Sequence, residues 1–146
     1  MELITEELVV LNLKSDSKEE IIKELAQKLV DAGLVDDYSS YLSSLFKREE
    51  IAPTTVGYDI GLPHGKCSSV KKASIAFATL EKPVVWDLAT DEKVKMIFML
   101  AIPENEDSST HSNLLVELSR KILDDNFRER LGKIKVVEEI VKLINS

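Results

Sequence analysis

Only one cysteine and two histidines occur among the 146 residues of this chain, and their scarcity excludes several kinds of site. Cys67 has no second cysteine with which to form an internal disulfide, and one thiolate cannot build a structural zinc site. The two histidines do not have the HExxH spacing of helical zinc sites. We therefore expect no metal and no cofactor.

The chain also lacks a long apolar run and an excess of positive charge. No run reaches the roughly 18 apolar residues of a membrane span, and residues 1–7 are acidic where a secretory signal would be basic and then apolar. We expect a cytoplasmic protein without direct membrane insertion. The formal net charge of −7 leaves little basis for binding a phosphate backbone, so no nucleic acid is expected as a partner.

What the chain does have is enough apolar sequence for one domain, since 44% of its residues are hydrophobic and one core over residues 1–146 can be built from them. Alternation and helical periodicity predict strands over 8–13, 72–80, 84–86 and 94–102, a short extended piece at 60–62, and helices over 17–33, about 37–52, 111–123, 126–131 and 136–144. Residues 81–83 are expected to turn, the rest of 57–69 to be loop, Gly132 to end the fourth helix, and Trp86 and Phe98 to join the core. Strands interleaved with helices predict an α/β fold with helices on both faces of the sheet.

The first histidine, His64, lies between a proline and a glycine. Pro63 fixes its own φ and pushes Leu62 toward extended conformations, while Gly65 can adopt φ > 0 and leaves the backbone after the imidazole uncrowded. This placement predicts an exposed imidazole in a turn, where it can meet another macromolecule.

The second histidine, His111, follows the turn-like residues 104–110 and precedes the apolar positions Leu114, Leu115 and Leu118. It is therefore predicted at the N-terminus of a helix. The free N–H groups and positive dipole end of such a terminus bind anions, and the hydroxyls of residues 108–110 add donors.

Arg48 is expected in the last turns of the second helix, which Pro53 must end. If Arg48 projects toward both histidines, the site suits a phosphoryl group. It would combine a neutral imidazole nucleophile, a guanidinium, a second imidazole and a helix N-terminus. Phosphoryl transfer depends mostly on positioning and on stabilising the charge of the transferred group. Such a site needs no metal ligands.

Each of these residues also has a simpler interpretation. The alternatives are that His64 is a solvated turn residue, that His111 is an ordinary residue in the first turn of its helix, and that Arg48 is a solvated charge at a helix end. Cys67 near His64 suggests a Cys–His nucleophile, but proximity in sequence alone is weak support for one.

The motifs taken together resemble a known family. They are Arg48-Glu49, then Pro53-Thr54-Thr55-Val56-Gly57, then Gly61-Leu62-Pro63-His64-Gly65-Lys66, and finally Phe98 to Pro103 before His111-Ser112-Asn113-Leu114-Leu115. This series is similar to the IIA component of the fructose-mannitol type of the phosphoenolpyruvate-dependent sugar phosphotransferase system, and the match covers essentially the whole chain. The resemblance implies a mixed β-sheet flanked by helices.

The resemblance also implies roles for individual residues. His64 would be the phosphorylated nucleophile, accepting phosphate from HPr and passing it to a cysteine of a IIB component that serves a IIC permease, while His111 and Arg48 would face the phosphohistidine.

Gly61 stands where the family often has alanine, and Ser112 where a leucine or isoleucine usually follows the second histidine. The length of the 103–110 loop resembles fructose-type members.

Two rival functions stand beside the transport role. A regulatory paralogue resembling the nitrogen-related IIA proteins would take the same phosphate but act by binding target proteins. A two-histidine acid–base hydrolase such as a nuclease is the other, and the acidic composition argues against it.

Overall fold

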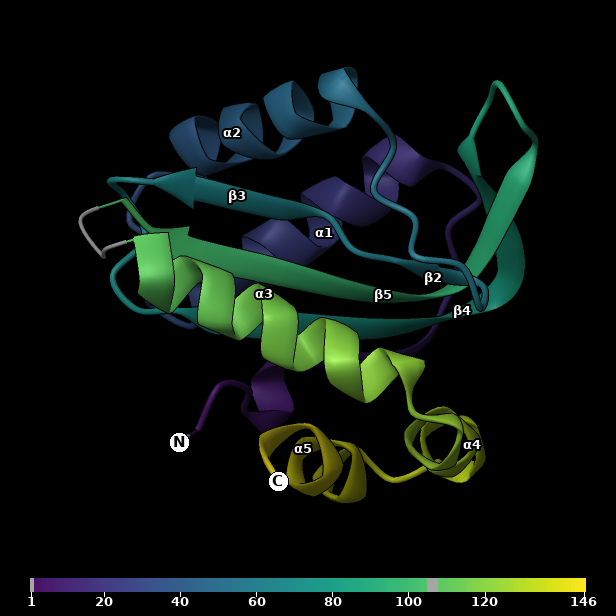
Figure 1. Ribbon diagram of the computed structural model, residues 1–146. Helices are drawn as coiled ribbons and strands as arrows, with labels where there is room; N and C mark the ends of the chain where they lie inside the picture. Colours follow the sequence, from purple (N-terminus) through teal and green to yellow (C-terminus); the bar gives the residue numbers. More distant parts are fainter. Residues whose placement is uncertain (1, 105–107) are drawn as a thin grey trace.

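The computed structural model describes residues 2–104 and 108–146, except for the side chains of residues 108–113. Along the chain the elements are η1 (Glu6–Leu8), β1 (Val9–Leu13), α1 (Lys18–Asp31), α2 (Tyr38–Ile51), β2 (Ile60–Gly61), β3 (His64–Cys67), β4 (Ser74–Asp87), β5 (Glu92–Pro103), α3 (Ser108–Leu123), α4 (Asp125–Lys133) and α5 (Val137–Asn145). Figure 1 shows their arrangement around one central sheet.

The sheet is mixed. Its order is β1-β4-β5, and both β2 and β3 pair with the far edge of β5. The long strands β4 and β5 form an antiparallel hairpin, whereas β1 runs parallel to β4, and β2 and β3 run parallel to β5. The register places His64 opposite Leu100 and Cys67 opposite Pro103. The single-domain α/β fold with a mixed sheet is as predicted.

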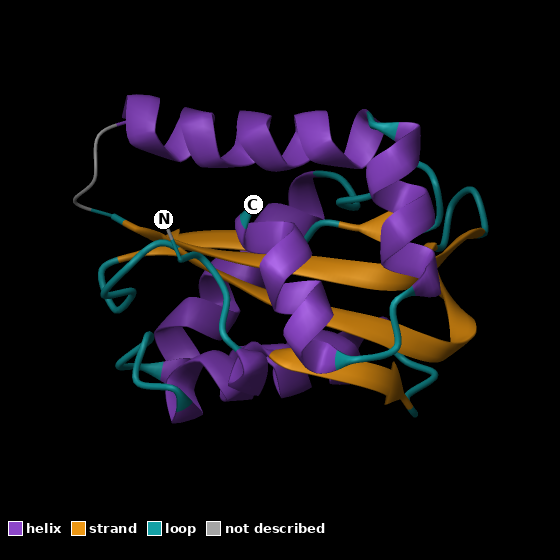
Figure 2. Cartoon of the chain, turned by 90° about the horizontal axis from the view of Figure 1, so that it is seen from below, coloured by secondary structure: helices purple, strands orange, loops and turns teal. Residues whose placement is uncertain are grey.

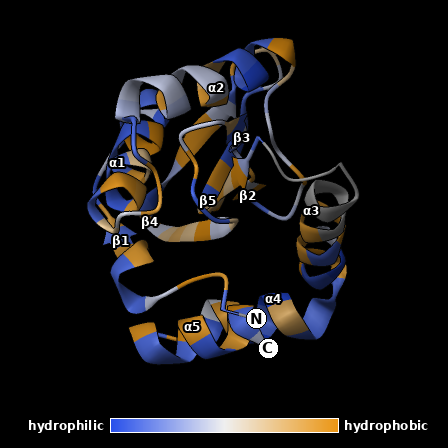
Figure 3. Ribbon diagram, turned by 90° about the vertical axis from the view of Figure 1, so that its left-hand side faces the viewer, coloured by the Kyte–Doolittle hydropathy of each residue, from blue (hydrophilic) through white to orange (hydrophobic). Residues whose placement is uncertain are grey.

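Helices cover both faces of this sheet, as Figure 2 and Figure 3 show from two further directions. The helices α1 and α2 lie on one side, and α3, α4 and α5 lie on the other. Because β5 is covered on both faces, its residues 97–102 are all buried and all apolar. Trp86 and Phe98 belong to the core, as predicted, with 1% and 0% exposure. No helix among the described residues is long and apolar enough to cross a membrane.

The helix ends on the α1–α2 side follow local sequence signals. The Ser17 hydroxyl accepts the N–H of Glu20 at 3.3 Å and caps α1, and the Asp37 carboxylate caps α2 by accepting the N–H of Ser40. Gly33 follows α1 with φ +77°, the left-handed conformation expected of a helix stop. The Asp37 cap fixes where α2 begins, and the helix ends at Ile51, shortly before Pro53.

Three of the predicted local features are wrong. Residues 64–67 form the strand β3 instead of a loop, because they pair with β5. The chain at 81–83 continues β4 instead of turning; the register with β5 shifts between Thr79 and Val84, so Pro83 lies where no N–H is needed for that ladder. Gly132 lies inside α4, which ends at Lys133.

Candidate active site

His64 begins the edge strand β3, immediately after Pro63. Its ring is half-buried, which corrects the prediction of an exposed turn imidazole. The Pro63 carbonyl accepts the N–H of Leu100 at 3.0 Å, so pairing with β5 extends past the strand and draws the histidine into the sheet.

A hydrogen bond determines which ring nitrogen of His64 carries the proton. The Nδ1 atom of His64 lies 2.9 Å from the carbonyl oxygen of Leu62. A carbonyl only accepts hydrogen bonds, so Nδ1 must carry the proton. In the neutral ring the Nε2 atom then holds the free lone pair. The backbone therefore prepares Nε2 of His64 as a nucleophile.

Gly65 is not needed for a positive φ, which the sequence analysis considered, but for close packing. Its φ is not positive. A Cβ atom at this position would lie 2.3 Å from Ser44 Oγ and 3.1 Å from Tyr41 Cε1, both on α2. The glycine is needed because α2 passes close to β3, and this contact sets the distance between the helix that carries Arg48 and the strand that carries His64.

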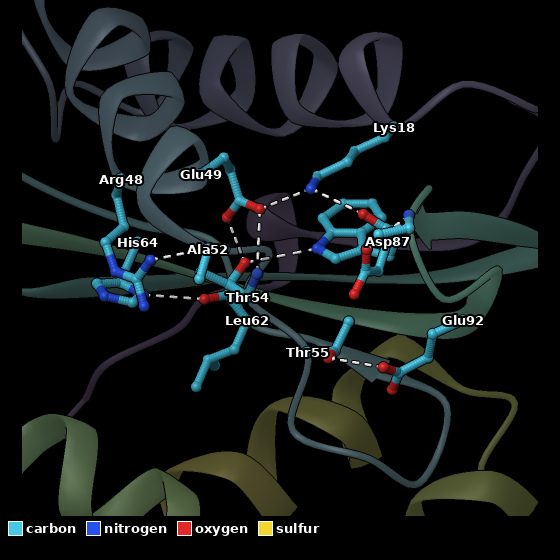
Figure 4. A network of polar contacts seen from close by, with 12 residues as sticks. Lys18, Arg48, Glu49, Ala52, Thr54, Thr55, Leu62, His64, Asp87 and Glu92 are labelled. Atoms are coloured by element: carbon cyan, nitrogen blue, oxygen red, sulfur yellow. Dashed lines mark hydrogen bonds and ion pairs between the residues drawn. The ribbon is translucent and has the colours of Figure 1, made fainter.

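Arg48 lies in the last turn of α2, as predicted. Its Nη1 atom donates to the carbonyl oxygen of Ala52 at 2.9 Å, which holds the chain where it leaves the helix. In Figure 4 the Arg48 guanidinium extends from the end of α2 to the region of the His64 ring. The bond to Ala52 uses only part of the donor capacity of the guanidinium. The structure thus brings the predicted nucleophile and the predicted cation into one region.

His111 lies within the first turns of α3, in agreement with the prediction of a helix start. Its side chain, the hydroxyls of residues 108–110 and the whole of residues 105–107 lie outside the described part of the structure. The preceding strand β5 ends at Pro103, opposite Cys67 at the far end of the strand that His64 begins. That His111 faces His64 stays a prediction.

Behind Arg48 lies a polar network that the sequence analysis missed (Figure 4). The carboxylate of Glu49 is 7% exposed and forms an ion pair of 2.7 Å with Lys18. It also accepts the backbone N–H of Thr54 at 3.1 Å and the Thr54 hydroxyl. One signal was available: a glutamate near a helix C-terminus opposes the helix dipole, so it usually needs a partner of its own.

The Lys18 ammonium is held by more than the carboxylate. It donates to the Trp86 carbonyl at 2.9 Å and lies 5.0 Å from the centre of the indole ring. The indole Nε1–H in turn points to the Thr54 hydroxyl oxygen at 3.4 Å. The network therefore connects α1, the end of α2, the following loop and β4.

Cys67 lies on the opposite side of β3 from His64. Side chains alternate along a strand, so Cys67 shares the face of Gly65, toward α2. Its Sγ atom lies 3.2 Å from Ser40 Oγ and 2.9 Å from Ser69 Oγ. Burial raises the pKa of the Cys67 thiol, but the hydrogen bonds to Ser40 and Ser69 outweigh this and leave the pKa below its ordinary value. The geometry does not support a Cys67–His64 pair.

The arrangement suits transfer of an anionic group to and from a nitrogen nucleophile. The imidazole is oriented by a backbone acceptor, and a guanidinium lies in the same region. Among the described side chains, no three from His, Cys, Asp and Glu are grouped to hold a metal ion.

Comparison with known proteins gives one family. Residues 2–146 match the family described as the phosphoenolpyruvate-dependent sugar phosphotransferase system, EIIA 2. The chain is 35% identical over 136 residues to the PTS system 2-O-alpha-mannosyl-D-glycerate-specific EIIABC component of Escherichia coli, covering 92% of this chain and 21% of that protein. It is 37% identical over 125 residues to the PTS system fructose-specific EIIA component of Haloferax volcanii, covering 86% and 80%. The chain thus spans about a fifth of the length of the first relative and most of the second.

Two solved structures of IIA proteins are similar to this chain over nearly its whole length. The nitrogen regulatory protein IIA-Ntr of Neisseria meningitidis superposes with a TM-score of 0.86 at 27% identity, covering 98% of this chain and 97% of that one. The enzyme IIA for mannitol of Escherichia coli, solved in complex with phosphorylated enzyme IIB, superposes with a TM-score of 0.80 at 26% identity, covering 98% and 99%.

Proposed function

Since the chain belongs to the EIIA type 2 family of the phosphoenolpyruvate-dependent sugar phosphotransferase system, a family of phosphotransferase components, we propose that it carries a phosphoryl group on His64. The observation that supports this residue is the hydrogen bond from Nδ1 to the Leu62 carbonyl, which leaves the Nε2 lone pair free for attack. The site residues of the proposal are His64, His111 and Arg48.

The proposed donor is the phosphohistidine of HPr. The Nε2 atom of His64 attacks the phosphorus, a new N–P bond forms, and the N–P bond of the donor breaks with its electron pair returning to the donor imidazole. The positive charge that develops on the His64 ring is spread toward Nδ1–H, where the Leu62 carbonyl stabilises it. Arg48 and His111 stabilise the charge on the phosphoryl oxygens during transfer.

The second half of the cycle passes the group to a cysteine of a IIB component. The thiolate attacks the phosphorus, and the N–P bond to His64 breaks. The solved complex of a IIA protein with a phosphorylated IIB protein supports a partner of this kind. A IIB/IIC permease for a fructose-type sugar is the proposed destination, supported by the fructose-specific relative. A phosphocarrier with these partners works in the cytoplasm.

A second candidate is a regulatory protein of the nitrogen-related type, which would carry the same phosphate but act by binding target proteins. The likeness to the IIA-Ntr structure favours it. The chemistry at His64 would be unchanged. Purified IIB separates the two functions, because only the transport component should pass its phosphoryl group to the IIB cysteine at a rate comparable with its own phosphorylation.

The test is incubation with phosphoenolpyruvate, the first enzyme of the relay and HPr, followed by mass measurement. One added phosphoryl group, stable in base and labile in acid, is expected on His64. A chain whose mass stays unchanged under conditions that phosphorylate a known IIA protein would refute the proposal.

A further inference from the structure

The buried carboxylate of Glu49 is connected to the nucleophile through the backbone. Glu49 holds Thr54 by its N–H and its hydroxyl. The Thr54 carbonyl accepts the N–H of Leu62 at 2.7 Å. The Leu62 carbonyl is the acceptor for Nδ1 of His64 at 2.9 Å. An unbroken series of hydrogen bonds thus runs from the carboxylate to the imidazole, and Figure 4 shows its members.

We propose that Glu49, paired with Lys18 and acting through Thr54 and Leu62, is a positioning residue that keeps the His64 imidazole in the Nδ1–H form. This inference rests on the proposed function in assigning His64 as the phosphoryl acceptor. Glu49 does not touch the reacting atoms; it fixes the acceptor that selects the tautomer.

A carboxylate is suited to this task for two reasons. Thr54 presents two donors, and an ionised carboxylate is the one side-chain group that only accepts. A buried charge is also costly to leave unpaired, so the ion pair with Lys18 holds the carboxylate in a single place. An amide at this position has one accepting oxygen in place of two for the Thr54 N–H, the Thr54 hydroxyl and the Lys18 ammonium, and it carries no charge to pair with Lys18.

The loop itself needs such an anchor. Between Thr54 and Leu62 the backbone adopts positive φ at Gly57, Tyr58 and Asp59, with values of 81°, 57° and 62°. Positive φ is unfavourable for the two residues that are not glycine. A loop with this conformation holds its register only when both of its ends are fixed. The bonds from Glu49 hold the Thr54 end, and the bond between the Thr54 carbonyl and the Leu62 N–H joins it to the other end, which β2 also holds by pairing with β5.

The chain offers a matched control for the carboxylate, because the next residue is also a glutamate and is exposed. Glu49→Gln and Glu50→Gln make the same change in charge on adjacent residues. The neutral tautomer of His64 is measured in unphosphorylated protein by long-range ¹H–¹⁵N correlation spectra of ¹⁵N-histidine samples, with His64→Ala assigning the signals. We expect the Nδ1–H form in the wild type and in Glu50→Gln, and a large population of the Nε2–H form in Glu49→Gln.

A second pair tests the next step in the series. Thr54→Val keeps the shape of the side chain but removes the hydroxyl, while Thr54→Ser keeps the hydroxyl. Thr54→Val should shift the tautomer as Glu49→Gln does, and Thr54→Ser should not. If Glu49→Gln fails to fold, the comparison of Thr54→Val with Thr54→Ser shows whether the hydrogen bonds at Thr54 select the tautomer of His64.

The rate of phosphorylation by phospho-HPr gives the functional measurement. It should fall about tenfold in Glu49→Gln and Thr54→Val, by analogy with the low end of the roughly 10–100-fold loss seen when a hydrogen-bond partner behind a metal-binding side chain is removed. It should stay near wild type in both controls. A merely structural role would lower the midpoint of thermal unfolding without moving the tautomer, and that outcome would overturn the inference. The tautomer spectra need no phosphate donor. A wild-type protein that accepts no phosphate would therefore refute the proposed function, while the spectra would still decide the role of Glu49.

Discussion

Replacing Gly65 by alanine tests the close packing of α2 against β3. The new Cβ atom would lie 2.3 Å from Ser44 Oγ, 3.1 Å from Tyr41 Cε1 and 3.4 Å from Leu45 Cγ. The Ser44 hydroxyl is not free to move without cost, since it donates to the Tyr41 carbonyl at 2.6 Å. Tyr41 is fully buried and donates its own hydroxyl to the Leu100 carbonyl at 2.8 Å. Either Ser44 must rotate or α2 must move away from β3.

The size of the effect follows from these contacts. Overpacking of a well-packed site by one methyl group costs about 1–3 kcal/mol. For a chain of this size, each kcal/mol lowers the unfolding midpoint by about 2–4 °C. A shift of α2 would also displace Arg48 relative to His64, and a misplacement on the order of 1 Å can lower a transfer rate by about 10²-fold. Gly65→Ala should therefore lower both the unfolding midpoint and the rate of phosphorylation.

A double-mutant cycle separates the two sources of this loss. Ser44→Ala alone removes one partly buried hydrogen bond and should cost about 1 kcal/mol or less. In the double variant Gly65→Ala/Ser44→Ala the nearest atom to the new Cβ becomes Tyr41 Cε1 at 3.1 Å, a tight contact that a small adjustment relieves. The double variant should be more stable than the sum of the single changes by about 1 kcal/mol.

Thermal and urea unfolding followed by circular dichroism give the free energies, and transfer from phospho-HPr gives the rate. A Gly65→Ala protein with wild-type stability and rate would refute the argument that α2 and β3 need the glycine. Simple additivity of the two substitutions would show that Ser44 Oγ is not the obstructing atom.

The remaining predictions concern the candidate site. His64→Ala should fold and accept no phosphate, because it removes the nucleophile; undiminished labelling of this variant would exclude His64 as the acceptor. His111→Ala should slow phosphorylation by roughly 10²-fold without abolishing it, as expected for loss of one preorganised donor, and a complete loss in mass spectra would instead make His111 a candidate acceptor. Cys67→Ser should leave phosphorylation and onward transfer nearly unchanged, since the thiol faces α2 and not the imidazole; a large loss of transfer to IIB would revive a role for the thiol.

The sequence by itself determined those elements whose signals are local. The first helix was predicted over 17–33 from its helical periodicity, and the structure has α1 there, capped by Ser17 and followed by Gly33. The apolar residues of β5 likewise predicted a strand over 94–102, and the structure has β5 there. The set of Arg48, His64 and His111 was found because their spacing and neighbours resemble one family. Local signals of this kind act over a few residues and need no knowledge of what packs where.

The tertiary structure decided the features that depend on distant partners. His64 lies in a strand and not in a turn because β3 pairs with β5, more than thirty residues along the chain. The tautomer of its ring depends on the Leu62 carbonyl, and the need for Gly65 depends on the approach of α2. Glu49 and Glu50 show the difference most directly. The sequence presents two identical neighbours, yet one is buried against Lys18 and Thr54 and the other is exposed, because only packing determines which side of a helix end meets the core.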